Sequence, residues 1–143
     1  MEIRQARMGD EKPMSYLITQ LGYPTSIEQM KERFEQIHSH SDYRTWLAFV
    51  DEEVVGLIAA VKSYFYEKDG EYVRIVAFVV DGEHRGQGVG RRLMQRAEDW
   101  ATSIGAFTMA LNSGANEERT NAHEYYKKAG FLETNVGFTK SMK

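Results

Sequence analysis

The sequence predicts an α+β (α/β) fold, forming a single domain over residues 1–143, and three neighbouring observations support it. Residues 72–80 are almost all β-branched, aromatic or aliphatic, which is typical of a buried strand. Residues 88–104 carry apolar side chains at helical spacing. Between them, the stretch HRGQGVGRR at residues 84–92 has three alternate glycines, which let the backbone turn sharply and let another molecule approach its amides.

The amino-terminal part predicts a strand followed by two helices. Residues 2–6 alternate between polar and apolar side chains, which favours a short strand. Asp10 can begin a first helix that ends near Gly22. Ser26 and Gln29 have the spacing of a capping box, and the helical apolar pattern that follows predicts a second helix.

The remaining elements follow from turn signals and periodicity. Residues 45–50 and 54–61 are β-rich runs joined by an acidic turn, which predicts a hairpin. The long helix is expected to close at Gly105, before a strand at residues 107–111. A last helix should end at Gly130, and residues 131–142 are expected to supply two short strands.

Composition excludes several classes of protein. The chain has no cysteine, which rules out thiolate catalysis, disulfides and zinc–thiolate sites. A net charge of −3 gives no reason to expect a nucleic-acid or anionic-membrane partner. No apolar stretch reaches 18 residues and the amino terminus has no hydrophobic signal region, so we expect no membrane partner and a cytoplasmic location.

A strand, a glycine-rich loop and a helix in succession indicate an anion-binding site. Arg91 and Arg92 fall in the first helical turn, where cations oppose the helix dipole unless a bound polyanion compensates them. The dinucleotide pattern G-x-G-x-x-G fails because Arg91 or Leu93 occupies the third glycine position. The P-loop pattern fails because no lysine follows at the required spacing.

The pattern that fits is R-x-x-G-x-G, formed by Arg85, Gly88 and Gly90. About thirty residues later, RTNAHEYYKKAGF at residues 119–131 fits A-x-x-[FLY]-Y-x-x-x-G-F. In these two motifs, and in layout over essentially the whole chain, the sequence resembles the GNAT superfamily of acyl-CoA-dependent N-acetyltransferases. It is weakly similar to the small-amine branch that includes aminoalkylphosphonate and aminoglycoside acetyltransferases.

The resemblance implies a three-layer fold, with helices on both faces of a central mixed, mostly antiparallel sheet whose parallel strand pair splays apart. It also implies acetyl-CoA as co-substrate. Pantetheine would pair with the main chain where the strand at residues 72–80 ends, and the loop would cradle the pyrophosphate. The implied cofactor-binding residues are Phe78, Val79, Val80, Arg85, Gly86, Gln87, Gly88, Val89, Gly90, Arg91 and Arg119.

The resemblance also assigns a catalytic residue. Tyr126 occupies the family's tyrosine position, and its hydroxyl can donate a proton to the departing thiolate without being charged at pH 7. For the general base the sequence departs from the family pattern, because Arg74 and Ala77 stand where some members carry a glutamate. The nearby acids, including Asp81, are expected to be solvated loop residues, so we expect deprotonation through water. Arg74 either points outward or meets an acidic group of the acceptor.

The sequence therefore predicts direct transfer of an acetyl group to a primary amine of a small molecule, in a ternary complex. His38 and His40 lack a third ligand at fixed spacing, so no metal site is expected. The aromatic residues between positions 64 and 72 could stack on an amine or a polyamine, or could form a homodimer surface. The alternatives are a non-catalytic acyl-CoA sensor and a peptide or protein acetyltransferase.

Overall fold

The computed structural model describes residues 1–112 and 120–143, with the side chains of residues 120–122 left aside. The chain forms two compact units, Met1–Met109 and Ala110–Lys143. The single domain expected over residues 1–143 stays a prediction.

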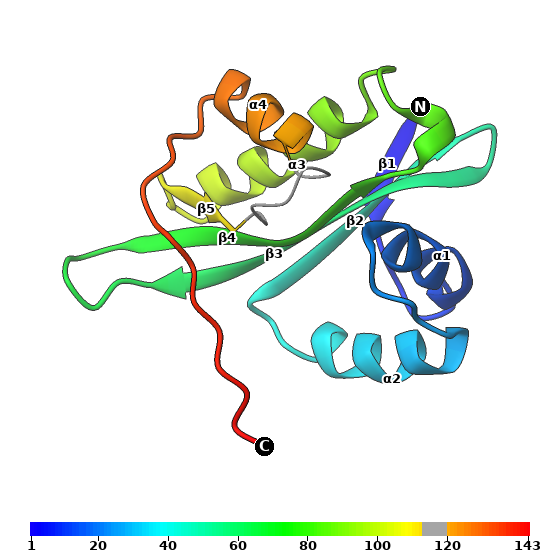
Figure 1. The fold of residues 1–143 in the computed structure, drawn as a ribbon, viewed down its shortest axis with the longest axis horizontal. Helices are drawn as coiled ribbons and strands as arrows, with labels where there is room; N and C mark the ends of the chain where they lie inside the picture. Colours follow the sequence, from blue (N-terminus) through cyan, green and yellow to red (C-terminus); the bar gives the residue numbers. More distant parts are fainter. Residues whose placement is uncertain (113–119) are drawn as a thin grey trace. The chain divides into compact units, whose positions relative to one another are not determined.

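The sheet has five strands in the order β1-β2-β3-β4-β5. Their bounds are β1 Glu2–Gln5, β2 Tyr43–Val50, β3 Glu53–Tyr64, β4 Glu71–Val80 and β5 Met109–Leu111. The first four pair antiparallel, whereas β5 runs parallel to β4. The Val73 amide donates to the Thr108 carbonyl (N···O 3.0 Å), so β5 begins beside the start of β4. The predicted mixed, mostly antiparallel sheet is confirmed (Figure 1).

Helices cover both faces of this sheet in the first unit, as expected (Figure 1). Helices α1 (Glu11–Leu21) and α2 (Ile27–His38) pack on one face, and α3 (Val89–Ser103) packs on the other. The core beneath α1 and α2 is made of buried apolar side chains from both layers, among them Met14, Leu17, Phe34, Leu47, Leu57, Ala59 and Val79.

The starts of the first two helices are fixed differently. The capping box is confirmed for α2, because the Ser26 hydroxyl accepts from the Gln29 amide (3.1 Å) and the Gln29 side chain accepts from the Ser26 amide (2.9 Å). Asp10 precedes α1 but makes no side-chain cap. Its carboxylate instead binds the guanidinium of Arg4 through two 2.9 Å hydrogen bonds and accepts from the Arg7 amide (2.8 Å).

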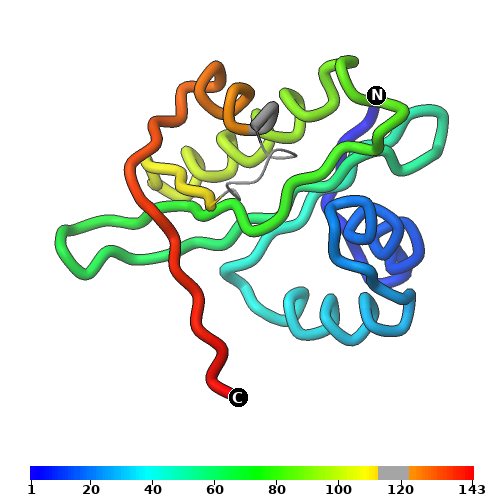
Figure 2. Tube along the Cα trace, in the orientation of Figure 1, coloured from blue at the N-terminus to red at the C-terminus, as the bar shows by residue number. Residues whose placement is uncertain are grey.

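Two hairpins organise the sheet. The predicted acidic turn between β2 and β3 is confirmed, with Asp51 and Glu52 both at positive φ (50° and 70°), the geometry that matches strand twist in tight hairpins. Strands β3 and β4 are longer than the other strands, and the hairpin that they form extends past the rest of the sheet (Figure 2). The Lys62 amide donates to the Asp42 carbonyl (2.9 Å), just before β2 begins. The tip of the β3–β4 hairpin, with the aromatic residues between positions 64 and 72, therefore lies beyond β2.

One β-bulge interrupts the pairing of β3 and β4. Ala59 pairs with Ala77, but the next residue, Ala60, pairs with Ile75, so Val76 is an extra residue in β4. An inserted residue reverses the alternation of side chains along its own strand. Side chains with odd residue numbers after Val76 therefore share a face of the sheet with side chains that have even residue numbers before it.

Helix α3 approaches the sheet closely at a glycine. A Cβ at Gly56 would lie 2.8 Å from Leu93 Cδ1 and 2.9 Å from Val89 Cγ1, both on buried side chains. Only a residue without a side chain lets α3 pack at this distance from β3. The helix ends as predicted, with Gly105 at φ 81° just past its last turn.

The second unit contains helix α4, Thr120–Lys128, and the predicted stop at Gly130 (φ 97°) is confirmed. The two short strands expected after it are wrong, because residues 131–143 contain no strand. Leu132 and Phe138 are 84% and 91% exposed, so the apolar pattern of this segment is not buried. A strand needs a neighbour for its backbone groups, and none is described for this segment within residues 120–143.

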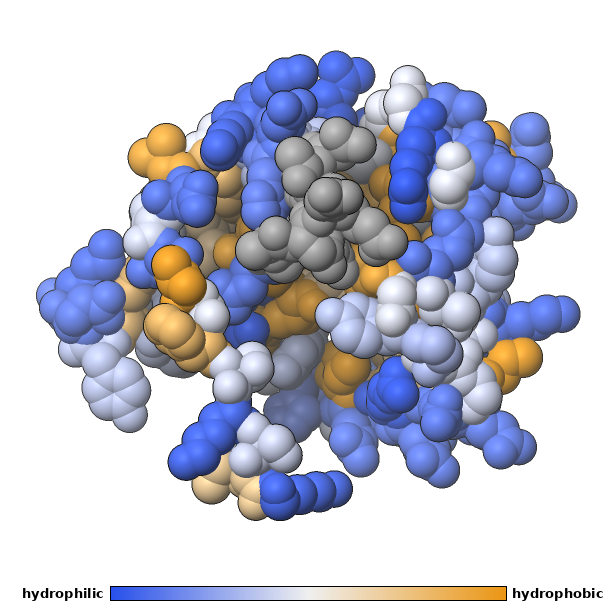
Figure 3. Space-filling view, viewed as in Figure 1, coloured by the Kyte–Doolittle hydropathy of each residue, from blue (hydrophilic) through white to orange (hydrophobic). Residues whose placement is uncertain are grey.

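The surface agrees with a charged chain. Hydrophilic residues occupy most of the face in Figure 3, and hydrophobic ones show in smaller areas. Among the described residues, none of the helices has the length and apolar character needed to cross a membrane.

Candidate active site

Strand β4 leads directly into the predicted anion-binding loop. After Asp81 the chain makes one 3-10 turn, η1 (Gly82–His84), and then passes through Gly86 and Gly88 into α3. Both glycines have positive φ, 79° and 82°. Residues with a side chain rarely adopt this backbone conformation, which explains why the loop needs glycine at these two positions.

The amino terminus of α3 faces this loop without a compensating charge. Its first i→i−4 hydrogen bond runs from the Arg92 amide to the Gly88 carbonyl (3.1 Å), so the amides of residues 89–91 have no partner within the helix. The first turn contains no acidic residue and Gly88 offers no capping side chain. Donor amides with the positive end of the dipole and nearby arginines fit a phosphate-bearing ligand.

Asp81 anchors the loop to α1. Its carboxylate accepts hydrogen bonds from the amide group of Gln20 (2.5 Å) and the hydroxyl of Tyr16 (3.1 Å), and pairs with Nδ1 of His84 (2.9 Å). The Gln20 side chain also accepts from the Gly82 amide (3.0 Å). Asp81 is only 7% exposed, so the expectation of a solvated loop acid is wrong for this residue.

These hydrogen bonds act on the titration of Asp81. The amide of Gln20, followed by His84 and Tyr16, stabilises the charged carboxylate and lowers the pKa of Asp81, although burial acts in the opposite direction. Asp81 therefore remains an anion at neutral pH and holds its partners as an acceptor. Sequence inspection missed this cluster because Tyr16 and Gln20 precede Asp81 by 65 and 61 residues.

The predicted cofactor residues at the end of β4 lie beneath this loop. Arg85 Nε donates to the Val80 carbonyl (3.3 Å), which ties the loop back to the strand. A Cβ at Gly90 would lie 3.2 Å from the Phe78 ring, so α3 passes closely over Phe78. Val79 is buried on the opposite face, in the core with α1 and α2.

The other predicted site residues differ in position. Gln87 and Arg91 are exposed, and an Arg91 nitrogen lies 3.7 Å from the Cβ position of Gly88. The Val89 side chain is buried under α3, so only its backbone faces the loop. Arg119 lies outside the described residues.

Tyr126, the predicted proton donor, belongs to the second unit. Its ring packs against Tyr125 and Phe131, with centroid distances of 5.7 and 5.9 Å, and its carbonyl accepts from the Phe131 amide (2.9 Å). These contacts fix the tyrosine at the carboxyl end of α4.

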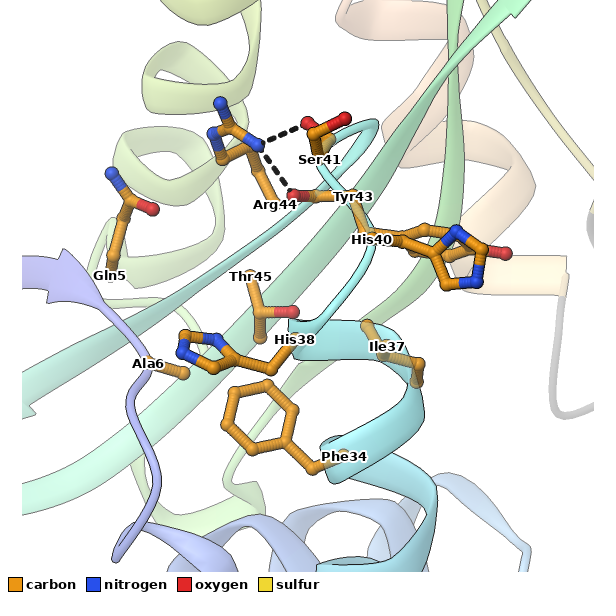
Figure 4. A pocket seen from close by; sticks show the side chains of 10 residues that line it. All are labelled: Gln5, Ala6, Phe34, Ile37, His38, His40, Ser41, Tyr43, Arg44 and Thr45. Carbon is orange, nitrogen blue, oxygen red and sulfur yellow. Dashed lines mark hydrogen bonds between the residues drawn. The ribbon is translucent and has the colours of Figure 1, made fainter.

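The two histidines considered as a metal pair do not converge. Figure 4 shows a pocket of about 120 Å³ between α2 and the start of β2; both histidines line it, but the His38 ring lies near Phe34 and the His40 ring lies beside Tyr43. His38 stacks near Phe34 (5.2 Å between centroids) and His40 near Tyr43 (6.0 Å). Each imidazole therefore has a separate aromatic neighbour.

Comparison with known proteins agrees with this geometry. The model of the acetyltransferase (GNAT) family matches residues 11–131. The chain belongs to the GNAT acetyltransferase family. Glucosamine 6-phosphate N-acetyltransferase of Arabidopsis thaliana is 27% identical over 147 residues, covering 97% of this chain and 95% of the relative. Aminoalkylphosphonate N-acetyltransferase of Salmonella typhimurium is 31% identical over 96 residues, covering 67% and 61%.

The fold agrees with that of solved GNAT proteins. The crystal structure of a GNAT family acetyltransferase of Staphylococcus aureus superposes with a TM-score of 0.83 at 32% identity, covering 99% of this chain and 98% of the other. This GNAT protein is therefore an acyl-CoA-dependent N-acetyltransferase, and the family's co-substrate is acetyl-CoA.

Proposed function

We propose that this GNAT enzyme transfers the acetyl group of acetyl-CoA directly to a primary amine of a small molecule, in a ternary complex. The observation that carries the proposal is the glycine loop at an uncapped helix amino terminus. That loop offers amides and arginines for the pyrophosphate of the cofactor, while β4 ends beneath it. The residues that would hold acetyl-CoA are those predicted above.

Direct transfer follows from the chemistry of the chain. The sequence has no cysteine that could carry an acetyl group between two half-reactions. The amine nitrogen attacks the thioester carbonyl, the carbon–sulfur bond breaks, and the leaving thiolate takes a proton from the Tyr126 hydroxyl. The proton lost by the amine passes to water, because Arg74 and Ala77 supply no carboxylate from β4.

A small acceptor is favoured by the relatives. Glucosamine 6-phosphate and aminoalkylphosphonates, named in the matching acetyltransferases, are small molecules that carry an amine. Helix α1 packs against β3 and β4 on one face of the sheet, and α2 packs beside it against β2. An acceptor bound there would reach the end of β4 from the face opposite α3.

The test is acetyl-CoA-dependent thiol release with a panel of small amines, comparing wild type with Tyr126→Phe. Loss of a proton donor is expected to lower kcat by about 100-fold to 10,000-fold while the affinity for acetyl-CoA holds. Tyr125→Phe is the matched control, because it removes a neighbouring hydroxyl in the same helix and is expected to keep kcat.

The possible outcomes separate the alternatives. Turnover of an amine that falls in Tyr126→Phe alone supports the proposal. Acetyl-CoA binding without turnover of any small amine, combined with acetylation of a peptide, would replace the small acceptor by a peptide or protein. Binding with no acetylation of either class would favour a sensor and contradict the proposal.

A further inference from the structure

Arg74 is a cation in the middle of a strand, and none of the described residues neutralises its charge. It lies four residues before Phe78 in β4 and its side chain is exposed, whereas both sequence neighbours, Val73 and Ile75, are buried. Within the described parts of the chain, no hydrogen bond, ion pair or ring contact holds its guanidinium. Arg4 and Arg44, by contrast, are both bound to oxygen atoms and lie over aromatic rings.

The bulge at Val76 determines the face on which Arg74 stands. Leu57, Ala59 and Val61 alternate along β3, and the first two belong to the core beneath α1 and α2. Residues paired directly across an antiparallel ladder share a face. Arg74 pairs with Val61, so it lies on the α1 and α2 side of the sheet.

The same register places Arg74 in line with the end of β4. Ala77 pairs with Ala59 and therefore shares the face of Arg74, although the two are three residues apart. A strand rises about 3.3 Å per residue, so the Cα atoms of Arg74 and Phe78 are separated by roughly 13 Å or less. A long arginine side chain can span much of that distance toward an acceptor whose amine reacts near Phe78.

The neighbours of Arg74 in the register of the sheet leave its positive charge available to a ligand. The row across the sheet runs from Arg74 through Val61 to Tyr43, and neither neighbour is acidic. The cation nearest in register, Lys62, is already beside Asp42 (Nζ···Oδ1 3.7 Å). A planar guanidinium in this position matches an oxyanion with two parallel hydrogen bonds.

We propose that Arg74 binds an oxyanion of the acceptor, a phosphate, phosphonate or carboxylate group on the same small molecule as the reacting amine. Arg74 is then a specificity-determining residue and takes no part in acetyl transfer. The inference rests on the proposed function, since it assigns the acceptor to the face of β4 that carries Arg74.

The experiment uses amines that differ in the anion alone, namely 2-aminoethylphosphonate, β-alanine and n-propylamine, which has a methyl group in place of the anion. We expect wild type to favour an anionic amine in kcat/KM. Arg74→Gln should lower kcat/KM for that amine about tenfold to a hundredfold, mainly through KM, and leave n-propylamine unchanged. Arg74→Lys should restore part of the loss, and Arg74→Glu should deepen it. The phosphonate and the carboxylate distinguish the two kinds of oxyanion.

Arg7→Gln is the matched control, because it removes the same charge from another exposed arginine. It should leave kcat/KM unchanged for the amines with an anion and for n-propylamine. An equal fall in kcat/KM for the amines with an anion and for n-propylamine in Arg74→Gln, or no fall at all, would overturn the inference. Turnover of n-propylamine tests the proposed function independently of Arg74. Calorimetric titration of 2-aminoethylphosphonate into the CoA-saturated protein tests Arg74 independently of turnover, and binding that Arg74→Gln leaves unchanged contradicts the inference.

Discussion

The amide nitrogen of Gln20 lies 2.5 Å from a carboxylate oxygen of Asp81, and this contact joins the first helix to the loop that precedes α3. The Gln20 oxygen simultaneously accepts from the Gly82 amide. One side chain of α1 thus holds both the carboxylate and the backbone at the start of the loop. The loop geometry therefore depends on α1, which lies on the other face of the sheet from α3.

Asp81→Asn should weaken this connection. The substitution places an NH₂ group opposite donors from Gln20 or His84, and a buried polar group left without a partner costs about 1–3 kcal/mol. We expect that loss in the free energy of urea unfolding, together with a raised KM for acetyl-CoA. Glu83→Gln removes a charge from the same turn at an exposed position and should change neither quantity. Equal behaviour of the two variants would argue against an anchoring role.

Stability should fall in acid because of Asp10. Hydrogen bonding by Arg4 lowers the pKa of this carboxyl, with a further contribution from the Arg7 amide. A lowered pKa in the folded state stabilises the protein above the unfolded pKa of about 3.9, and that stabilisation is lost as pH falls through the folded value. Urea unfolding from pH 7 to pH 3 should show a steeper decline for wild type than for Asp10→Asn. Glu32→Gln, on an exposed part of α2, should follow wild type.

Gly56→Ala tests the packing of α3 on β3. The added methyl would meet the buried side chains of Leu93 and Val89 at less than 3 Å, and overpacking of this kind costs about 1–3 kcal/mol. Thermal unfolding should therefore shift to lower temperature. Gly137→Ala, which meets no atom within 4 Å, is the control and should leave the transition in place. An unshifted Gly56→Ala would mean that α3 can move away from the sheet at little cost.

Gly88 and Gly105 provide a matched pair at the two ends of one helix. Their φ angles are 82° and 81°, so alanine is strained equally at both, by about 1–2 kcal/mol. Both variants should lose similar stability in chemical denaturation. Only Gly88→Ala, at the loop, should also raise the KM for acetyl-CoA. A similar KM in the two variants would place the cofactor away from this end of α3.

The parts of the fold that could be predicted from sequence are those with local causes. The capping box at Ser26 and the glycine stop at Gly105 depend on residues a few positions apart, and the structure confirms both. The burial of Asp81 depends on Tyr16 and Gln20, which reach it only through the tertiary fold. The bulge at Val76 likewise depends on pairing with β3 and has no local signature.

The carboxyl-terminal segment shows the same limit from the other direction. Its alternating apolar residues satisfy the local requirement for strands, but a strand also needs a partner edge for its backbone groups. Residues 131–143 contain no strand, although the helix before them ends where Gly130 predicts. For the candidate site, the loop glycines followed from sequence, whereas the side chains that anchor the loop did not.

The extra residue at position 76 lets β4 change its length without changing the face of any other side chain. Deleting Val76 would leave Ala77 opposite Ala59 and Ile75 opposite Ala60, so the strand would simply become regular. Arg74 would stay opposite Val61, on the face that it occupies now. In an enzyme of this architecture, β4 can therefore gain or lose a residue at this point while both ends of the strand keep the orientation of their side chains.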